Sequence, residues 1–278
     1  MRLVTGTLLP VFNHPLKLAG EIAMLDAISG GRLDVGLARA FLPHEFRRFG
    51  ISPDESYARF REGLEQVELL LTTEHATHRG AFHSFADVTS LPRPTQKPRP
   101  PFYIAATQTP DTFEFAGRAG HALMAIPIGP LRGLLELYRR SWKEAGHPGD
   151  GDVMVAFHMF CHRDPRLARD IARKPFETYF RALGEAAGDW VTGPASKDYR
   201  DYDKAIAKMK GFTVESQVES GGAWIGTPAE ITDIIARVSE TIGPFEHASL
   251  QVNFADLDFT EAMNSLRLFA AEVMPAFA

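Results

Sequence analysis

The sequence predicts an α/β protein with a parallel sheet and helices packed outside it. Apolar, β-branched segments alternate along the chain with amphipathic segments of helical period. The strand segments are too apolar to face water on either side, which is typical of parallel sheets covered by helices. A Gly-x-Gly-x-x-Gly signature after a strand is absent, so a dinucleotide-binding fold loses its main support.

Composition places the chain among ordinary globular proteins. Its 278 residues can build one large core, and 45% hydrophobic with 23% charged residues is typical of that class. The formal net charge of -5 argues against nucleic-acid binding, and the single cysteine, Cys161, excludes an intrachain disulfide and a cysteine zinc site. We find no signal peptide and no run of about 20 apolar residues, so we expect a cytoplasmic protein that does not enter a membrane.

The first elements follow from apolar spacing and glycine. Residues 1–9 are an apolar run that predicts a buried parallel strand. Residues 15–28 have apolar residues at helical spacing, and Gly30-Gly31 ends this helix because glycine adopts the left-handed conformation at little steric cost.

The next strand, over residues 33–37, leads to a candidate binding residue. Apolar residues alternate there with small or polar ones, and Arg39 follows at the carboxyl end, where parallel α/β folds place their ligands. A guanidinium at that place can hold a phosphate through two parallel hydrogen bonds. The alternative is a surface ion pair with a helix carboxylate.

Three segments connect this strand to the next one. Residues 42–52 are predicted to be a loop. Ser52-Pro53 followed by acidic residues predicts the start of a helix that runs to about Leu71. Prolines in residues 80–101 exclude regular helix and indicate a short hairpin with an extended strap.

Residues 102–106 predict a strand that turns into a helix at Thr109-Pro110. The free backbone N–H groups of that helix start, with the hydroxyls of Thr107, Thr109 and Thr112, could form an anion site. Simple helix capping is the alternative. The remaining pattern predicts strands over residues 121–126, 153–161 and 247–254, helices over 131–145 and 260–273 and from Thr227-Pro228 onward, and charged helix with a polar stretch over 164–222.

Several segments form a set in a fixed order, spread over nearly the whole chain: Thr5-Gly6-Thr7, Leu9-Pro10, His14-Pro15, Ser29-Gly30-Gly31-Arg32-Leu33, Gly36-Leu37-Ala38-Arg39, Phe102-Tyr103-Ile104-Ala105-Ala106 and Ile225-Gly226-Thr227-Pro228. This set resembles the bacterial luciferase-like flavin-dependent monooxygenases. The resemblance implies a TIM (β/α)8-type barrel that binds reduced flavin at the carboxyl ends of its strands. We therefore expect a single barrel domain over residues 1–278, with a helical and polar insertion around residues 164–222.

The resemblance also implies which residues bind the flavin phosphate. Arg39 looks like the family's arginine on that phosphate, and Thr107, Gln108 and Thr112 look like a second phosphate contact. One departure weakens this site, because Tyr57 stands where the family motif has an arginine.

Four further residues look like neighbours of the flavin ring. Gly6 and Thr7 stand where family members carry a non-proline cis peptide bond beneath the ring, and we expect a cis bond there. Phe41 is expected to line the ring pocket. His44, on the loop that follows, is the catalytic candidate for orienting substrate or relaying a proton, with an ordinary surface histidine as the alternative. No metal site is expected.

The function implied by the resemblance is that of a flavin-dependent monooxygenase. Reduced FMN from a separate flavin reductase would react with O2 to oxidise a small organic substrate, and the chain would form a homo-oligomer such as a dimer. The alternatives are a non-catalytic flavin-binding or partner subunit of such a system, and an oxidoreductase that uses the deazaflavin F420.

The resemblance starts at the family's third strand, so the first two strand–helix units are apparently lacking. A start codon placed too late and a real loss are the two explanations. Without those units residues 1–4 and 249–252 would be unpaired sheet edges. We therefore expect the chain, expressed alone, to be oligomeric or to aggregate and to hold FMN poorly.

Overall fold

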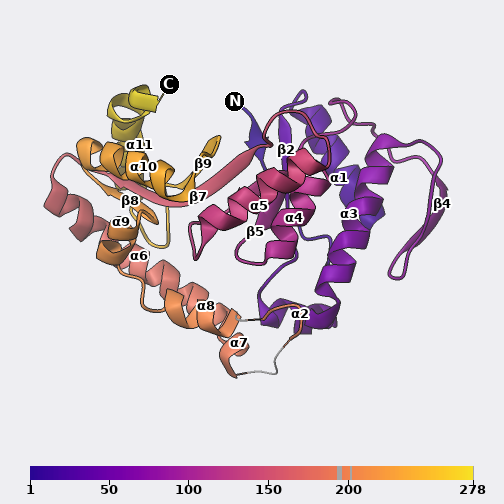
Figure 1. Cartoon of the computed structure of the whole chain (residues 1–278), viewed down its shortest axis with the longest axis horizontal. Coiled ribbons are helices and arrows are strands. Elements are labelled where there is room, and N and C mark those ends of the chain that lie inside the picture. The colour runs from indigo at the N-terminus through magenta and orange to yellow at the C-terminus, as the bar shows by residue number, and fades with distance from the viewer. Residues whose placement is uncertain (193–195, 201, 278) are drawn as a thin grey trace. The chain divides into compact units, whose positions relative to one another are not determined.

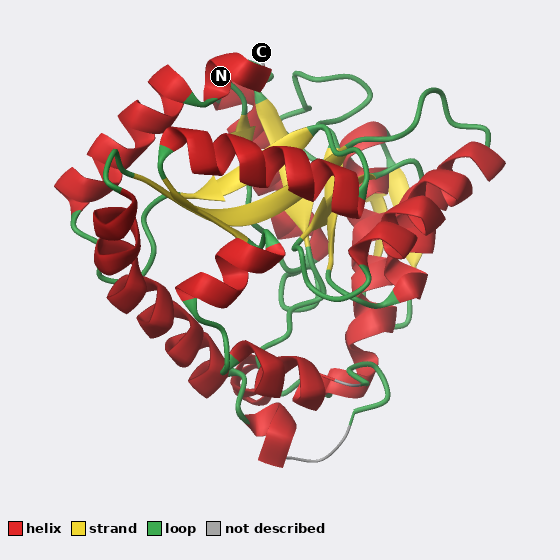
Figure 2. Ribbon diagram, turned by 60° about the vertical axis from the view of Figure 1, so that its left-hand side comes forward, coloured by secondary structure: helices red, strands yellow, loops and turns green. Residues whose placement is uncertain are grey.

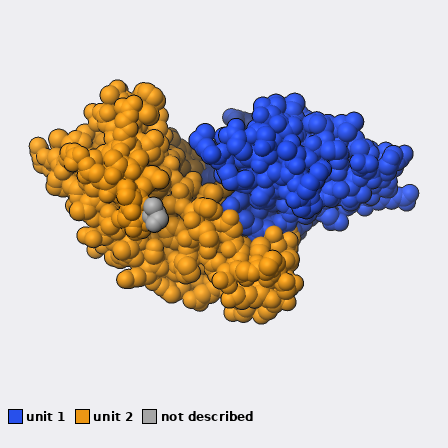
Figure 3. Space-filling view, turned by 90° about the horizontal axis from the view of Figure 1, so that it is seen from above, with its two compact units in different colours: residues 1–105, 121–123, 194–200 blue, residues 106–120, 124–193, 201–278 orange. Residues whose placement is uncertain are grey.

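The computed structural model describes residues 1–192, 196–200 and 202–277 (Figure 1). Parallel strands alternate with helices along the chain, which confirms the predicted α/β class. The chain divides into two compact units, coloured separately in Figure 3. Unit 1 comprises residues 1–105, 121–123 and 194–200, and unit 2 comprises residues 106–120, 124–193 and 201–278.

Unit 1 is built on short parallel strands. β1 (Leu3–Val4) pairs with β2 (Leu33–Leu37), and β2 also pairs with β5 (Phe102–Ala106). Every residue of β2 is buried, as its apolar pattern predicts. An isolated parallel bridge joins Leu8 to Leu37, so the chain beyond β1 continues alongside the end of β2.

The helices α1 (Pro15–Ile28) and α3 (Ser56–Thr72) lie close to the predicted positions. Unit 1 also contains α2 (Pro43–Phe49) and the 3-10 turn η1 (Pro53–Glu55). Ser52 accepts a hydrogen bond from the backbone N–H of Asp54, as predicted for a cap. The apolar stripe of α3 is fully packed, which places Phe60, Leu64, Val67 and Leu71 in the core.

A hairpin of β3 (Ala76–Arg79) and β4 (Ser84–Val88) follows α3. Its first strand lies before Gly80, so the prediction that the whole hairpin lies within residues 80–101 is wrong about where the hairpin begins. The Glu62 carboxylate of α3 fixes the turn by accepting the backbone N–H groups of residues 81–83.

Two other predictions for unit 1 are wrong. β1 is a two-residue strand whose Leu3 and Val4 are 42% and 41% exposed, instead of a buried strand over residues 1–9. Its only described sheet neighbour is β2, which leaves one edge uncovered. Residues 42–52 contain the helix α2 instead of a loop, since a proline at its first position and Gly50, at φ 64°, give it both termini.

Unit 2 is organised around β7 (Val153–Cys161). β8 (Ala223–Gly226) pairs in parallel with the second half of β7, and β9 (His247–Gln251) pairs with the first half. The boundary between the units passes through β6 (Ala122–Ala125). β8 was not predicted, because its four residues directly precede the strong helix start at Thr227. β9 is shorter and more exposed than the buried strand expected over residues 247–254.

Helices flank these strands (Figure 2). α11 (Phe259–Glu272) packs on β7, and α6 (Pro165–Ala186), α9 (Val214–Ser220) and α10 (Pro228–Ile242) pack on β8. Residues 164–222 are helical where described, apart from short connections, and a helix over residues 202–209 occupies part of the stretch that was expected only to be polar. None of the described helices is long and apolar enough to cross a membrane. The helices of unit 2 are α4 (Pro110–Arg118), α5 (Leu131–Glu144), α6 (Pro165–Ala186), α7 (Asp189–Thr192), α8 (Tyr202–Met209), α9 (Val214–Ser220), α10 (Pro228–Ile242), α11 (Phe259–Glu272) and the 3-10 turn η2 (Met274–Phe277).

Candidate functional site

Arg39 stands two residues beyond the end of β2. Its Nη1 donates a hydrogen bond to the backbone carbonyl of Asp198 at 3.2 Å. The guanidinium carbon lies 5.0 Å from the centre of the Tyr199 ring and 5.7 Å from that of Tyr57. No carboxylate among the described residues forms an ion pair with Arg39, so the alternative of a helix ion pair is not supported.

A second guanidinium, that of Arg61, lies beside Tyr57, the residue that stands where the family motif has an arginine. Arg61 donates a hydrogen bond to the Tyr57 hydroxyl, and its guanidinium carbon is 4.7 Å from the centre of the Tyr57 ring. The expected arginine is absent at position 57, yet the i,i+4 spacing on α3 brings a cation to its side chain. That spacing was visible in the sequence and was missed.

The Gly6–Thr7 peptide bond is cis, as predicted. The Thr5 hydroxyl just before it donates to the Gly36 carbonyl at 3.1 Å, and the Leu8 backbone N–H donates to the same oxygen at 2.8 Å. These bonds place Gly6 and Thr7 beside the end of β2, from which Arg39 emerges. A side chain at position 6 would meet nothing within 4 Å, so the backbone is open on that side.

Phe41 and His44 lie on the chain that follows Arg39. Phe41 is half-buried, and His44 is half-buried in the first turn of α2, not on the predicted loop. Phe46 anchors this helix, because its fully buried ring meets the rings of Phe12 and Tyr199 at 5.1 and 5.8 Å. His44 is thus held by a packed helix.

The other predicted phosphate residues belong to unit 2. Thr107 and Gln108 are half-buried just before α4, and Thr112 is 6% exposed in its first turn. Thr109 occupies the N-cap position, but its side chain makes no capping hydrogen bond, so the capping alternative does not account for this hydroxyl. The Thr107 hydroxyl lies 3.4 Å from that of Tyr202, which sequence reasoning missed because it comes from the distant helix α8.

The structure therefore assembles two groups of predicted residues, each within its own unit. Gly6, Thr7, Arg39, Phe41 and His44 belong to unit 1, and Thr107, Gln108 and Thr112 belong to unit 2.

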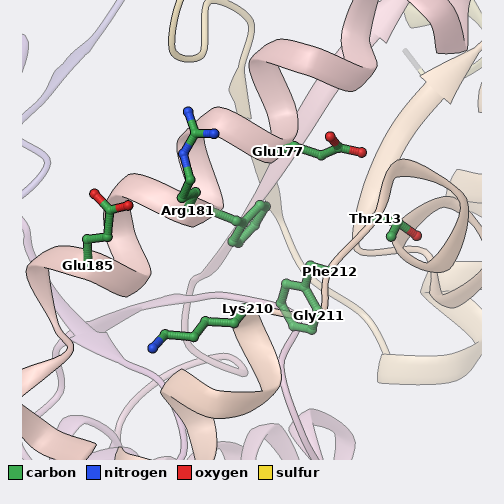
Figure 4. A pocket seen from close by; sticks show the side chains of 8 residues that line it. Glu177, Arg181, Glu185, Lys210, Gly211, Phe212 and Thr213 are labelled. Atoms are coloured by element: carbon green, nitrogen blue, oxygen red, sulfur yellow. The ribbon is translucent and has the colours of Figure 1, made fainter.

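A hollow in unit 2 lies elsewhere. It has a volume of about 570 Å³ and lies between α6 and the chain around Phe212 (Figure 4). Charged side chains such as Arg181 and Lys210 surround two phenylalanine rings there, and none of the predicted residues lines it. This open cleft is not part of either predicted group.

The unit 1 group presents an uncompensated cation at a strand end beside a cis peptide bond. Residues 1–243 match the family described as luciferase-like monooxygenase. The chain belongs to the luciferase-like monooxygenase family. It is therefore an oxidoreductase of the monooxygenase class.

Two proteins similar to this luciferase-like chain are named as monooxygenases. It is 28% identical to the oxygenase component of flavin-dependent trigonelline monooxygenase from Acinetobacter baylyi, over the whole chain and 77% of that protein. The crystal structure of monooxygenase RslO1 from Streptomyces bottropensis is similar with a TM-score of 0.86 and 40% identity, covering all of this chain and 79% of that one.

Two structures with lower sequence identity are similar to this chain in fold only. One is the oxygenating constituent of 3,6-diketocamphane monooxygenase from Pseudomonas putida in complex with FMN, with a TM-score of 0.80, 22% identity and coverage of 99% and 79%. The other is an F420-dependent secondary alcohol dehydrogenase, with a TM-score of 0.73, 16% identity and coverage of 100% and 80%. These likenesses support a barrel-type α/β fold for this luciferase-like chain.

Proposed function

We propose that the chain is the oxygenase component of a two-component flavin-dependent monooxygenase. Reduced FMN, supplied by a separate flavin reductase, binds with its phosphate on Arg39, and a small organic substrate is oxidised with O2. The observation that carries this proposal is the Arg39 guanidinium, held at a strand end with no described carboxylate to neutralise it. Arg61, beside Tyr57, adds positive charge to the same unit.

The residues present fit a phosphate-bearing flavin. A phosphate dianion needs charged donors in a fixed position, and Arg39 offers donors beyond the one that it uses on Asp198. The open backbone at Gly6 leaves room for a flat group beside the same strand end. When bound, reduced flavin supplies the two electrons that activate O2, while the protein positions it and excludes water.

Flavin chemistry needs few acidic or basic side chains from the protein. His44, on the packed helix α2, is the group that we assign to orienting substrate or moving a proton through its imidazole. Thr107, Gln108 and Thr112 supply hydroxyl and amide donors in unit 2, and we assign them to a second phosphate contact.

An F420-dependent oxidoreductase is the second candidate, supported by the fold likeness to the alcohol dehydrogenase. The two are separated by incubating the chain with reduced FMN and with reduced F420. Substrate-dependent O2 consumption with FMN supports the first. Oxidation of reduced F420 in the absence of O2, with the two electrons passing to the organic substrate, supports the second. Binding without turnover in both supports a non-catalytic flavin-binding subunit.

Replacing Arg39 with alanine tests the phosphate contact. Arg39→Ala should weaken FMN binding by roughly 10- to 150-fold, which corresponds to about 1.5 to 3 kcal/mol for a lost charge-assisted hydrogen bond. Riboflavin lacks the phosphate and should bind both proteins equally in a fluorescence titration.

Arg48→Ala is the matched control, because Arg48 is an exposed arginine of α2 and its loss should change neither titration. Equal losses for FMN and riboflavin in Arg39→Ala would show that Arg39 does not meet the phosphate.

A further inference from the structure

Residues 196–200 belong to unit 1, although residues 124–193 and residues 201–278 belong to unit 2. The Asp54 carboxylate accepts hydrogen bonds from the Ser196 hydroxyl at 2.6 Å and the Lys197 backbone N–H at 2.9 Å. Farther along, the Asp198 carboxylate accepts the Tyr57 backbone N–H at 3.0 Å. Hydrogen bonds therefore hold the segment at two points, at η1 through Asp54 and at the first turn of α3 through Tyr57.

Tyr199 is the residue of this segment that reaches Arg39. It is 4% exposed, and its hydroxyl donates to the Ala40 carbonyl at 2.9 Å, with the Arg39 carbonyl at 3.4 Å. Ala40 has a φ of 70°, a left-handed conformation that costs free energy for a residue with a side chain. The Tyr199 hydroxyl thus holds the turn that aims Arg39.

The same residue supports the Arg39 side chain without neutralising it. The guanidinium lies over the Tyr199 ring, and the hydrogen bond that it makes among the described residues goes to the uncharged carbonyl of Asp198. A free arginine has many rotamers and loses that freedom when it grips a phosphate. A ring face and a carbonyl restrict these rotamers in advance, whereas a carboxylate would compete with the phosphate for the charge.

We propose that Tyr199 is a positioning residue that holds Arg39 ready for the phosphate of the flavin, so that the 196–200 segment completes the site of unit 1. This inference rests on the proposed function, because it assigns the Arg39 site to a phosphate-bearing flavin. Tyr199 acts through Arg39 and does not itself touch the cofactor.

Fluorescence titrations with FMN and riboflavin test the proposal on the full chain. Tyr199→Phe keeps the ring and removes the hydroxyl, and we expect 3- to 10-fold weaker FMN binding with unchanged riboflavin binding. Tyr199→Leu also removes the ring and should weaken FMN binding more. Tyr138→Phe is the control, since the Tyr138 hydroxyl likewise bonds backbone, at Asp152 in unit 2, and its loss should leave the FMN-to-riboflavin ratio unchanged.

A double-mutant cycle separates positioning from a structural role. In the Arg39→Ala background, Tyr199→Phe should have no further effect on FMN binding, because the side chain that it positions is gone. An equal loss with and without Arg39, or an equal loss for FMN and riboflavin, would overturn the inference. If Arg39→Ala discriminates FMN from riboflavin and Tyr199→Phe does not, the inference fails and the proposed function stands. If Arg39→Ala does not discriminate them, the proposed phosphate site itself fails.

Discussion

At the scale of single residues, His158 is a polar side chain within an aromatic cluster of unit 2. Its ring centre lies 4.8 to 5.4 Å from those of Phe176, Tyr179, Phe180 and Phe254. Its Nε2 atom is buried and has no hydrogen-bond partner among the described residues. Burial disfavours the charged imidazolium and lowers the pKa of His158 to about 4.

This burial makes the free energy of unfolding depend on pH. The unfolded chain takes up a proton on this histidine as the pH falls through about 6.5, whereas the folded chain resists until about pH 4. The contribution of the buried, neutral His158 to the free energy of unfolding is fully present above pH 6.5 and is lost as the pH falls toward 4. At pH 5 the loss is about 2 kcal/mol. His158→Phe fits the aromatic cluster and should remove this loss.

Urea unfolding at pH 7 and pH 5 measures the effect. The wild type should lose about 2 kcal/mol more than His158→Phe between the two values. The same pH dependence in both proteins would mean that His158 is protonated as easily when folded as when unfolded.

At the scale of elements, the contact between α4 and α5 depends on a glycine. A Cβ atom at Gly117 of α4 would lie 2.4 Å from the carbonyl oxygen of Tyr138 and 3.0 Å from the Ser141 Cβ on α5. Both neighbours are part of a helix and cannot swing aside. Gly117 therefore lets the two helices approach more closely than any other residue would allow.

Two glycine-to-alanine substitutions should have opposite effects. Gly117→Ala should lower the free energy of unfolding by roughly 1 to 3 kcal/mol, because the helices must separate. Gly133 on the exposed side of α5 has nothing within 4 Å of the Cβ position, so Gly133→Ala should raise it by about 0.5 to 1 kcal/mol. Chemical denaturation measures both. A gain in Gly117→Ala would show that the helices can adjust without cost.

At the scale of the whole molecule, unit 1 exposes apolar side chains along β1 and α1. β1 has a described strand partner on one side only, and its Val4 is 41% exposed. Ile28, at the end of α1, is 75% exposed. An apolar strand with one open edge is a template for pairing with another chain.

We expect the chain to self-associate through this edge. Size-exclusion chromatography with light scattering should show an oligomer, and Val4→Lys should shift it toward the monomer because a charged edge strand resists pairing. Phe259→Lys adds the same charge at a 69% exposed residue of unit 2 and should leave the mass unchanged. A monomeric wild type, or equal effects of both lysines, would exclude association through β1.

Local sequence patterns predicted much of the fold and part of the site. The α/β class, the stripe of α3 and the helix starts at Ser52 and Thr227 follow from periodicity and capping chemistry, which act within a few residues. The prediction of a cis bond between Gly6 and Thr7 rested on the family resemblance, and the bond is cis. The helix α2 was not predicted although Pro43 and Gly50 mark its ends, because its 7 residues are too few to show a helical period of apolar residues.

What the sequence determined by itself was the α/β class, most of the helices and strands, the family, and an arginine after a buried strand. Only the tertiary structure decided what surrounds that arginine. Asp198 lies 159 positions from Arg39, and no local pattern links them, yet the returning chain brings its carbonyl and the Tyr199 ring against the guanidinium. Periodicity records which face of an element is apolar, whereas contacts between distant segments depend on where the chain turns back and which backbone groups then need partners.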